Sequence, residues 1–148
     1  MRMQTVLIKC PNVNSLIVQN GFQFVTINIH GLIDWEEKNN AVRFFSWLLK
    51  KKCDIISFRE THGTVNDIKT WKQIGRFSLW NNGEWPLRGV AIIFNIHQGV
   101  VIKEDTKDND RRVLSCEIKM ENQIYKLINI YCSNNNAERK QFILSIDR

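Results

Sequence analysis

The fold of this chain is decided by two apolar stretches, Phe22-Gln23-Phe24-Val25-Thr26-Ile27-Asn28-Ile29 and Asp54-Ile55-Ile56-Ser57-Phe58-Arg59-Glu60. Both are short and rich in β-branched and aromatic residues, which predicts two strands. A helical pattern separates them, so strand, helix and strand form a crossover unit of an α/β fold. Because ligands collect at the C-terminal ends of strands in such sheets, Asn28 and Glu60 are candidate site residues.

A helical pattern fills the segment between these two stretches. Asp34 and Glu37 have the spacing of a capping box, in which each side chain accepts from the other residue's backbone N–H. Apolar residues then recur at i, i+3, i+4 and i+7 from Ala41 to Leu48, which predicts one buried helix face. The lysines at positions 50–52 fit either a solvated helix end or a contact with DNA.

The rest of the pattern alternates further strands with short helices. Apolar and polar residues alternate from Arg112 to Met120 and return from Ile124 to Tyr131, which predicts an antiparallel hairpin. The segment from Glu104 to Asp110 is predicted to be a charged turn. Further strands are expected at residues 76–80, 90–94 and 100–103, and helices at residues 65–74 and 137–146.

Composition indicates one globular domain. With 148 residues, 43% of them hydrophobic and 24% charged, the chain has room for one ordinary core. No apolar run approaches the roughly 18 residues of a membrane-spanning helix, so no membrane partner is expected. The net charge of +6 suits DNA, and suits equally a basic protein without such a partner. Four cysteines without Cys-x-x-Cys or paired-His spacing favour reduced thiols and an intracellular protein.

In this order and at this separation, the two stretches resemble the endonuclease/exonuclease/phosphatase superfamily. The branch that the run Glu60-Thr61-His62 resembles most is the endonuclease domain at the front of LINE-type (non-LTR) retrotransposon polyproteins. The resemblance covers residues 22–148 and implies an α/β fold, with two sheets packed as a sandwich and flanked by helices. Residues 1–21 stay outside it and are expected to be a leader. Three further stretches carry the resemblance: Arg88-Gly89-Val90-Ala91-Ile92-Ile93-Phe94, Arg111-Arg112-Val113-Leu114, and Leu127-Ile128-Asn129-Ile130-Tyr131-Cys132-Ser133-Asn134.

The resemblance implies a divalent cation, Mg²⁺ or Mn²⁺, at the strand ends. Glu60 is the implied metal ligand, since a hard cation prefers carboxylate oxygens. The alternative for Glu60 is a surface acid that ends a strand. Asn28 cannot titrate, but its amide is able to hold the metal, a metal-bound water or a phosphate oxygen. Otherwise Asn28 satisfies the turn before Gly31.

The resemblance also implies groups that face the scissile phosphate. Tyr131 and Asn134 match the Tyr-x-x-Asn of the family, and a Tyr hydroxyl is able to donate to an oxygen on which negative charge develops. The alternative for Tyr131 is an aromatic residue at a strand end whose ring is packed and whose hydroxyl is solvated. With Asn28 and Glu60, these residues make up the implied catalytic set. Three arginines are candidate contacts to nucleic-acid phosphates: Arg88, Arg111 and Arg112.

Three positions depart from the pattern of the family. Arg59 stands where Gln is usual, His30 stands where Asn or Asp is usual, and Cys132-Ser133 replaces a common Ala-Pro. A cation at position 59 could compete with the metal for the Glu60 carboxylate. We therefore expect Arg59 to weaken metal binding.

Two segments of the family do not occur in the sequence: a Gly-Asp-x-Asn, which supplies the water-activating Asp, and a closing Ser-Asp-His. We therefore expect a truncated domain, with its C-terminal part missing and without activity on its own. By resemblance, the function is metal-dependent phosphodiester hydrolysis by a nuclear DNA endonuclease of a retrotransposon. Two alternatives stay open: a non-catalytic DNA-binding or interaction module, and a repair nuclease or phosphatase of the same superfamily.

Overall fold

The computed structural model describes residues 3–9, 15–19, 22–29, 43–44, 46–47, 50, 53–72, 77–84, 88–95, 100–120 and 123–146. The predicted capping pair Asp34 and Glu37 lies outside the described residues, as does His30. Of the helix predicted after this pair, residues 43–44 and 46–47 are described and are helical. No helix in the described part of the chain is long and apolar enough to span a membrane.

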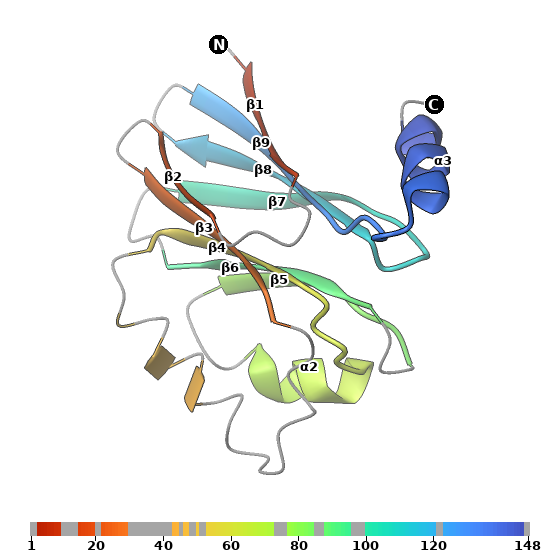
Figure 1. Cartoon of the computed structure of the whole chain (residues 1–148). Helices are drawn as coiled ribbons and strands as arrows, with labels where there is room; N and C mark the ends of the chain where they lie inside the picture. The colour runs from red at the N-terminus through yellow and green to blue at the C-terminus, as the bar shows by residue number, and fades with distance from the viewer. Residues whose placement is uncertain are drawn as a thin grey trace.

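The described strands form two sheets that lie one above the other (Figure 1). The five-stranded sheet has the order β2-β3-β4-β6-β5, and the four-stranded sheet has the order β1-β9-β8-β7. The strands of the five-stranded sheet are β2 (Ser15–Gln19), β3 (Phe22–Asn28), β4 (Ile55–Arg59), β5 (Phe77–Asn81) and β6 (Val90–Phe94). Those of the four-stranded sheet are β1 (Met3–Lys9), β7 (Val100–Lys107), β8 (Val113–Met120) and β9 (Gln123–Ile130). Two described helices complete the fold, α2 (Val65–Trp71) and α3 (Asn136–Ile146).

The pairing of the strands follows the sequence pattern closely. β3 and β4 are parallel neighbours, as the crossover unit predicts. β8 and β9 form the expected antiparallel hairpin, with Val113 opposite Ile130. The predicted α/β fold with two packed sheets is therefore confirmed.

Two apolar layers hold the sandwich together. Side chains of a strand point alternately to its two faces, so β4 directs Ile55 between the sheets and Phe58 toward the face that α2 covers. All five residues of β4 and of β6 are buried, as expected for strands that are covered on both sides. The inter-sheet core consists of Phe24, Ile55, Leu79, Val90, Ile92, Phe94, Leu114, Cys116, Ile118, Tyr125 and Leu127. The outer core consists of Ile56, Phe58, Ile68, Trp71, Trp80, Ala91 and Ile93.

The predicted charged turn at Glu104–Asp110 is wrong in its first half. β7 continues to Lys107 and pairs with β8 throughout, with a register irregularity between Glu104 and Thr106. Charged residues are tolerated here because β7 is an edge strand whose residues from Lys103 to Lys107 are all exposed.

The first 21 residues contribute two strands that the sequence analysis did not predict. β1 adds to the four-stranded sheet in parallel with β9, with Met3 opposite Ile124. β2 adds to the five-stranded sheet antiparallel to β3, with Ser15 opposite Thr26. Both strands occupy sheet edges, where backbone groups of the neighbouring strand accept a further partner. Residues 3–9 and 15–19 therefore belong to the two sheets, while the interpretation of residues 1–21 as a leader and the domain boundary at residue 22 stay predictions.

Candidate active site at the ends of β3, β4 and β9

Asn28 and Glu60 meet at the C-terminal ends of two parallel strands. Asn28 is the last residue of β3, and Glu60 directly follows β4. The Asn28 amide nitrogen donates to a carboxylate oxygen of Glu60 at 3.2 Å. The backbone of Glu60 has a φ of +54°, a left-handed conformation that is unfavourable for a residue with a side chain. The surrounding loop thus holds the Glu60 carboxylate beside the Asn28 amide.

Backbone hydrogen bonds join the loop after Glu60 to two arginine-bearing segments. The backbone N–H of Thr61 donates to the carbonyl of Gly89 at 3.2 Å, and that of His62 donates to the carbonyl of Arg88 at 2.7 Å. Gly89 in turn donates to the carbonyl of Arg111 at 3.3 Å. These bonds fix Arg88 and Arg111 next to the Glu60 loop. His62 contributes to this network through its backbone.

Tyr131 brings the four-stranded sheet into the site. It directly follows β9, and its backbone N–H donates to the carbonyl of Arg112 at 2.8 Å. Burial raises the pKa of the Tyr131 phenol above its usual value, and the hydrogen bond to Glu60 and the charge of Glu60 raise it further. The positive charges of Arg112 and Arg88 act on the pKa of Tyr131 in the opposite direction. The predicted residues Asn28, Glu60 and Tyr131 therefore converge, although they come from two different sheets.

The remaining predicted residues lie around this centre. The Arg112 guanidinium carbon lies 5.3 Å from the ring centre of Phe142, a cation–π contact that joins α3 to the site. Asn134 is exposed in the turn before α3, and its role at a phosphate stays a prediction. Arg59 is buried, with 1% of its surface exposed, and it lies on the inter-sheet face of β4 with Ile55 and Ser57.

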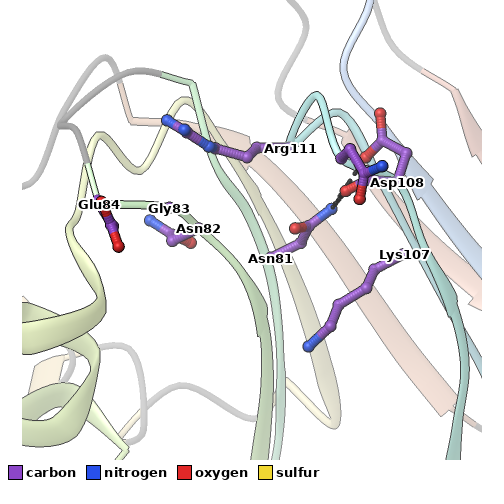
Figure 2. A pocket seen from close by; sticks show the side chains of 8 residues that line it. Asn81, Asn82, Gly83, Glu84, Lys107, Asp108 and Arg111 are labelled. Atoms are coloured by element: carbon purple, nitrogen blue, oxygen red, sulfur yellow. Dashed lines mark hydrogen bonds between the residues drawn. The ribbon is translucent and has the colours of Figure 1, made fainter.

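Two pockets are lined by segments that are hydrogen-bonded to the loop after Glu60. One, of about 330 Å³, is lined by Arg88, Asn109, Asp110 and Arg111. The other, of about 420 Å³, is drawn in Figure 2, where Arg111 and Lys107 extend on either side of Asn81. Its lining consists of Asn81, Asn82, Gly83, Glu84, Lys107, Asp108, Asn109 and Arg111.

The sequence analysis missed the asparagines that support this region. The Asn81 amide nitrogen donates to the carboxylate of Asp108 at 2.9 Å and to the carbonyl of Val113 at 2.7 Å (Figure 2 shows the first contact). The same Asp108 carboxylate oxygen accepts from the backbone N–H groups of Arg112 and Val113, both at 2.8 Å. Asn81 directly follows the strand predicted at residues 76–80, and this position was the available signal for its role.

Asn82 supports the Glu60 loop directly. Its amide nitrogen donates to the Thr61 hydroxyl at 2.8 Å and to the Gly63 carbonyl at 2.7 Å. Gly89 packs against the same groups, since a Cβ built at Gly89 would lie 2.2 Å from the Thr61 hydroxyl oxygen. Gly89 also has a φ of +100°, which a residue with a side chain rarely adopts.

The donor set of the site fits a hard divalent cation. Glu60 offers carboxylate oxygens and Asn28 offers an amide oxygen, which are ligand types that Mg²⁺ takes in proteins while it keeps several waters. The Asn28 amide donates to the Glu60 carboxylate and restricts its orientation, and Tyr131 lies close enough to Glu60 for its pKa to be raised by that carboxylate. Among the described residues, no group of three or more His, Cys, Asp or Glu side chains is arranged to hold a metal ion.

The two packed sheets and the short helices beside them define an α/β sandwich. No protein-family model matches the chain. Several solved structures share its fold, among them the following two. The first is the AP endonuclease LMAP from Leishmania major, with 16% sequence identity and a TM-score of 0.61 over 82% of this chain and 44% of that protein. The second is the 3′ phosphatase NExo from Neisseria bound to a product DNA hairpin, with 18% identity and a TM-score of 0.56 over 83% of this chain and 49% of that protein.

The extent of these matches is informative in itself. The chain spans less than half the length of each of the two proteins. At 16% and 18% identity the likeness establishes the shared fold.

Proposed function

We propose that this chain is the metal-binding and phosphate-contacting part of a divalent-metal-dependent DNA endonuclease of the LINE-type retrotransposon branch. One observation carries the proposal: Asn28, Glu60 and Tyr131 come from three strands in two sheets and meet at one point. A carboxylate, an amide and a phenol in contact form a polar site suited to a cation and a phosphate.

Glu60 and Asn28 would hold the ion in this proposal. The ion, Mg²⁺ or Mn²⁺, supplies charge that neutralises the phosphate. Tyr131 keeps its proton on the phenolic oxygen at neutral pH, because its pKa is raised above an already alkaline value. The phenol therefore acts as a hydrogen-bond donor that orients Glu60 and is within reach of a phosphate oxygen bound beside it.

The arginines around the site would attract the DNA backbone. Arg88 and Arg112 are close enough to Tyr131 to lower its pKa by their charge, so the same field reaches a phosphate at this position. Arg88 and Arg111 also line the pocket of about 330 Å³ that adjoins the site. A strand of DNA that enters the site would pass these side chains.

We further propose that this chain alone does not cleave DNA and that its place is intracellular, in the nucleus. The sequence has no Gly-Asp-x-Asn segment to supply a water-activating Asp, and removing groups that act as a unit typically lowers the rate by orders of magnitude. The run Glu60-Thr61-His62 and the Tyr-x-x-Asn of Tyr131 and Asn134 favour the retrotransposon branch over phosphatases. The four cysteines of the sequence show no Cys-x-x-Cys or paired-His spacing, in keeping with reduced thiols in a reducing compartment.

Calorimetric titration with Mn²⁺ tests the metal site. The wild-type chain should bind one ion weakly, and Glu60→Gln should abolish that binding, since it removes the carboxylate charge. The matched control is Glu84→Gln, which removes an exposed acid from the pocket of Figure 2 and should leave binding unchanged. Equal binding by wild type and Glu60→Gln would refute the assignment.

The pocket of two arginines and the charge of +6 also favour a second candidate, a DNA-binding module without catalysis. Both candidates predict DNA binding whose affinity falls steeply with salt, because bound phosphates release counterions. A plasmid-nicking assay, with Mg²⁺ added and Glu60→Ala as the control for contamination, addresses catalysis. Nicking that Glu60→Ala abolishes would show that the chain is itself active and would exclude the module. If neither nicking nor Mn²⁺ binding is found, the module is favoured.

A further inference from the structure

Asn129 is a fully buried polar residue at the interface of the two sheets. It lies in β9, two residues before Tyr131, with 0% of its surface exposed. Its side-chain nitrogen donates to the carbonyl of Phe58 and to the carbonyl of Ala91, both at 3.0 Å. Phe58 belongs to β4 and Ala91 to β6, so one amide of the four-stranded sheet is bonded to two central strands of the five-stranded sheet.

The two carbonyls occupy positions that matter for the site. Phe58 lies two residues before Glu60 on the same strand path, and Ala91 is directly opposite Phe58 in the β4–β6 pairing. Asn129 and Tyr131 are likewise two residues apart and share the face of β9 that turns toward the other sheet. The hydrogen bonds of Asn129 thus lie two residues before Tyr131 on β9 and two residues before Glu60 on β4.

An apolar interface alone does not fix this contact. Hydrophobic packing has no preferred direction, so the inter-sheet core tolerates small shifts of one sheet along the other. Two hydrogen bonds with defined geometry allow much less movement. The amide oxygen of Asn129 is buried without a hydrogen-bond partner among the described residues, which costs free energy that a leucine would not incur. The two hydrogen bonds that the Asn129 side-chain nitrogen donates therefore explain why a polar residue occupies this position.

We propose that Asn129 is a positioning residue that sets the register of the two sheets so that the Tyr131 hydroxyl meets the Glu60 carboxylate. The proposal deepens the proposed function and rests on it for the purpose of that contact. Asn129 itself touches neither Glu60 nor the phosphate position. Its effect is exerted through the backbones of β4, β6 and β9.

The test measures the contact between Tyr131 and Glu60 without metal or DNA. The chain has two tyrosines, Tyr125 and Tyr131, so labelling with 3-fluorotyrosine gives two ¹⁹F signals, which Tyr131→Phe assigns. In the wild-type background, Glu60→Gln should shift the Tyr131 signal, because the phenol loses a charged acceptor. In the Asn129→Leu background, the same change at Glu60 should no longer shift it. The full 148-residue chain is used throughout.

A control separates positioning from general weakening of the core. Leu127→Ala truncates a buried neighbour on the same face of β9 and should lower the melting temperature at least as much as Asn129→Leu. It should nevertheless keep the shift that Glu60→Gln causes. If Asn129→Leu keeps that shift too, or if both variants lose it, the proposal is wrong.

A second variant covers the case in which Asn129→Leu does not fold. Asn129→Thr keeps one donor, which cannot serve both carbonyls, and should reduce the shift; a full wild-type shift would overturn the proposal. Failure here is distinct from failure of the proposed function, because Mn²⁺ binding by Glu60 is measured separately. A chain that binds no Mn²⁺ still reports whether Asn129 controls the contact.

Discussion

The two sheets of this molecule differ in how much of their strands is exposed to solvent. Every residue of β4 in the five-stranded sheet is buried, whereas most residues of β7 in the four-stranded sheet are exposed, with Val101 at 64%. The outer face of the four-stranded sheet also carries an ion pair, Asp105 with Lys126. The five-stranded sheet is thus a platform fixed on both faces, while the other sheet is fixed mainly by its inner face.

This difference matters because the site draws on both sheets. Asn28 and Glu60 belong to the platform, and Tyr131 arrives from the four-stranded sheet. The platform strands hold their residues by packing on two sides, whereas Tyr131 depends on the interface between the sheets. Changes in the platform should therefore affect stability most, and changes at the rim of the four-stranded sheet should affect it least.

The largest effect is expected from truncating the platform. Phe58→Ala should lower the free energy of unfolding by about 3–5 kcal/mol, because a fully buried ring that packs against Phe44 is lost. Val101→Ala should change it by less than about 0.5 kcal/mol, since this side chain is mostly exposed. Urea denaturation of both variants measures the contrast. Equal losses would mean that the two sheets are held equally firmly, and the comparison would fail.

The second-largest effect on stability is expected in the loop that joins the five-stranded sheet to the site. Gly89→Ala should cost about 1–3 kcal/mol, because its φ of +100° and the nearby Thr61 hydroxyl leave no room for a Cβ. Gly83→Ala is the matched control, since the atoms that a Cβ would meet there belong to the end of the flexible Arg111 side chain. Thermal unfolding of both variants decides. A larger loss at Gly83 would show that the Glu60 loop is not held at Gly89.

A smaller effect is expected from the buried cation beside the site. Arg59→Gln should tighten Mn²⁺ binding about fivefold, since removing a nearby positive charge is worth on the order of 1 kcal/mol. Lys119→Gln, which removes an exposed charge from β8, should leave Mn²⁺ affinity unchanged. Calorimetric titration of wild type and both variants with Mn²⁺ gives the ratios of their affinities. Weaker binding in Arg59→Gln would mean that Arg59 supports the site through its buried position between the sheets.

The smallest effect is expected on the outer face of the four-stranded sheet. Lys126→Gln breaks the 2.8 Å ion pair with Asp105 and should cost less than about 1 kcal/mol, since both side chains are partly solvated. The hydrogen bond from Lys126 lowers the pKa of Asp105, and Asp105 raises the pKa of Lys126.

The sign of the pH dependence follows from these shifts. A lowered carboxyl pKa contributes stability that is present above the unfolded value of 3.8 and is lost as the pH falls through the folded pKa. A raised ammonium pKa contributes stability that is present below 10.5 and is lost at higher pH. The difference between wild type and Lys126→Gln should therefore vanish in acid and in strong alkali, and should shrink in high salt. A difference that persists at pH 2 would assign the loss to packing of the lysine stem.

Local patterns of apolar and polar residues predicted much of the fold. The continuous apolar runs of β4 and β6, the alternation in β8 and the return of β9 each gave a strand close to its observed bounds. The predictions failed where pairing overrides local preference. The charged residues of β7 from Glu104 to Lys107 form a strand because their backbone pairs with that of β8. β1 and β2 form for the same reason, since they pair with β9 and β3.

By itself, the sequence determined which residues end up at strand termini, and with them Asn28 and Glu60 as candidates, while the family resemblance implied Tyr131. Strand periodicity and strand ends are local properties, so a single sequence contains them. Only the tertiary structure decided that Tyr131 meets Glu60, that Arg59 is buried between the sheets, and that Asn129 is bonded to β4 and β6. These contacts join residues up to 71 positions apart, and their geometry depends on how two sheets pack, which no local pattern specifies.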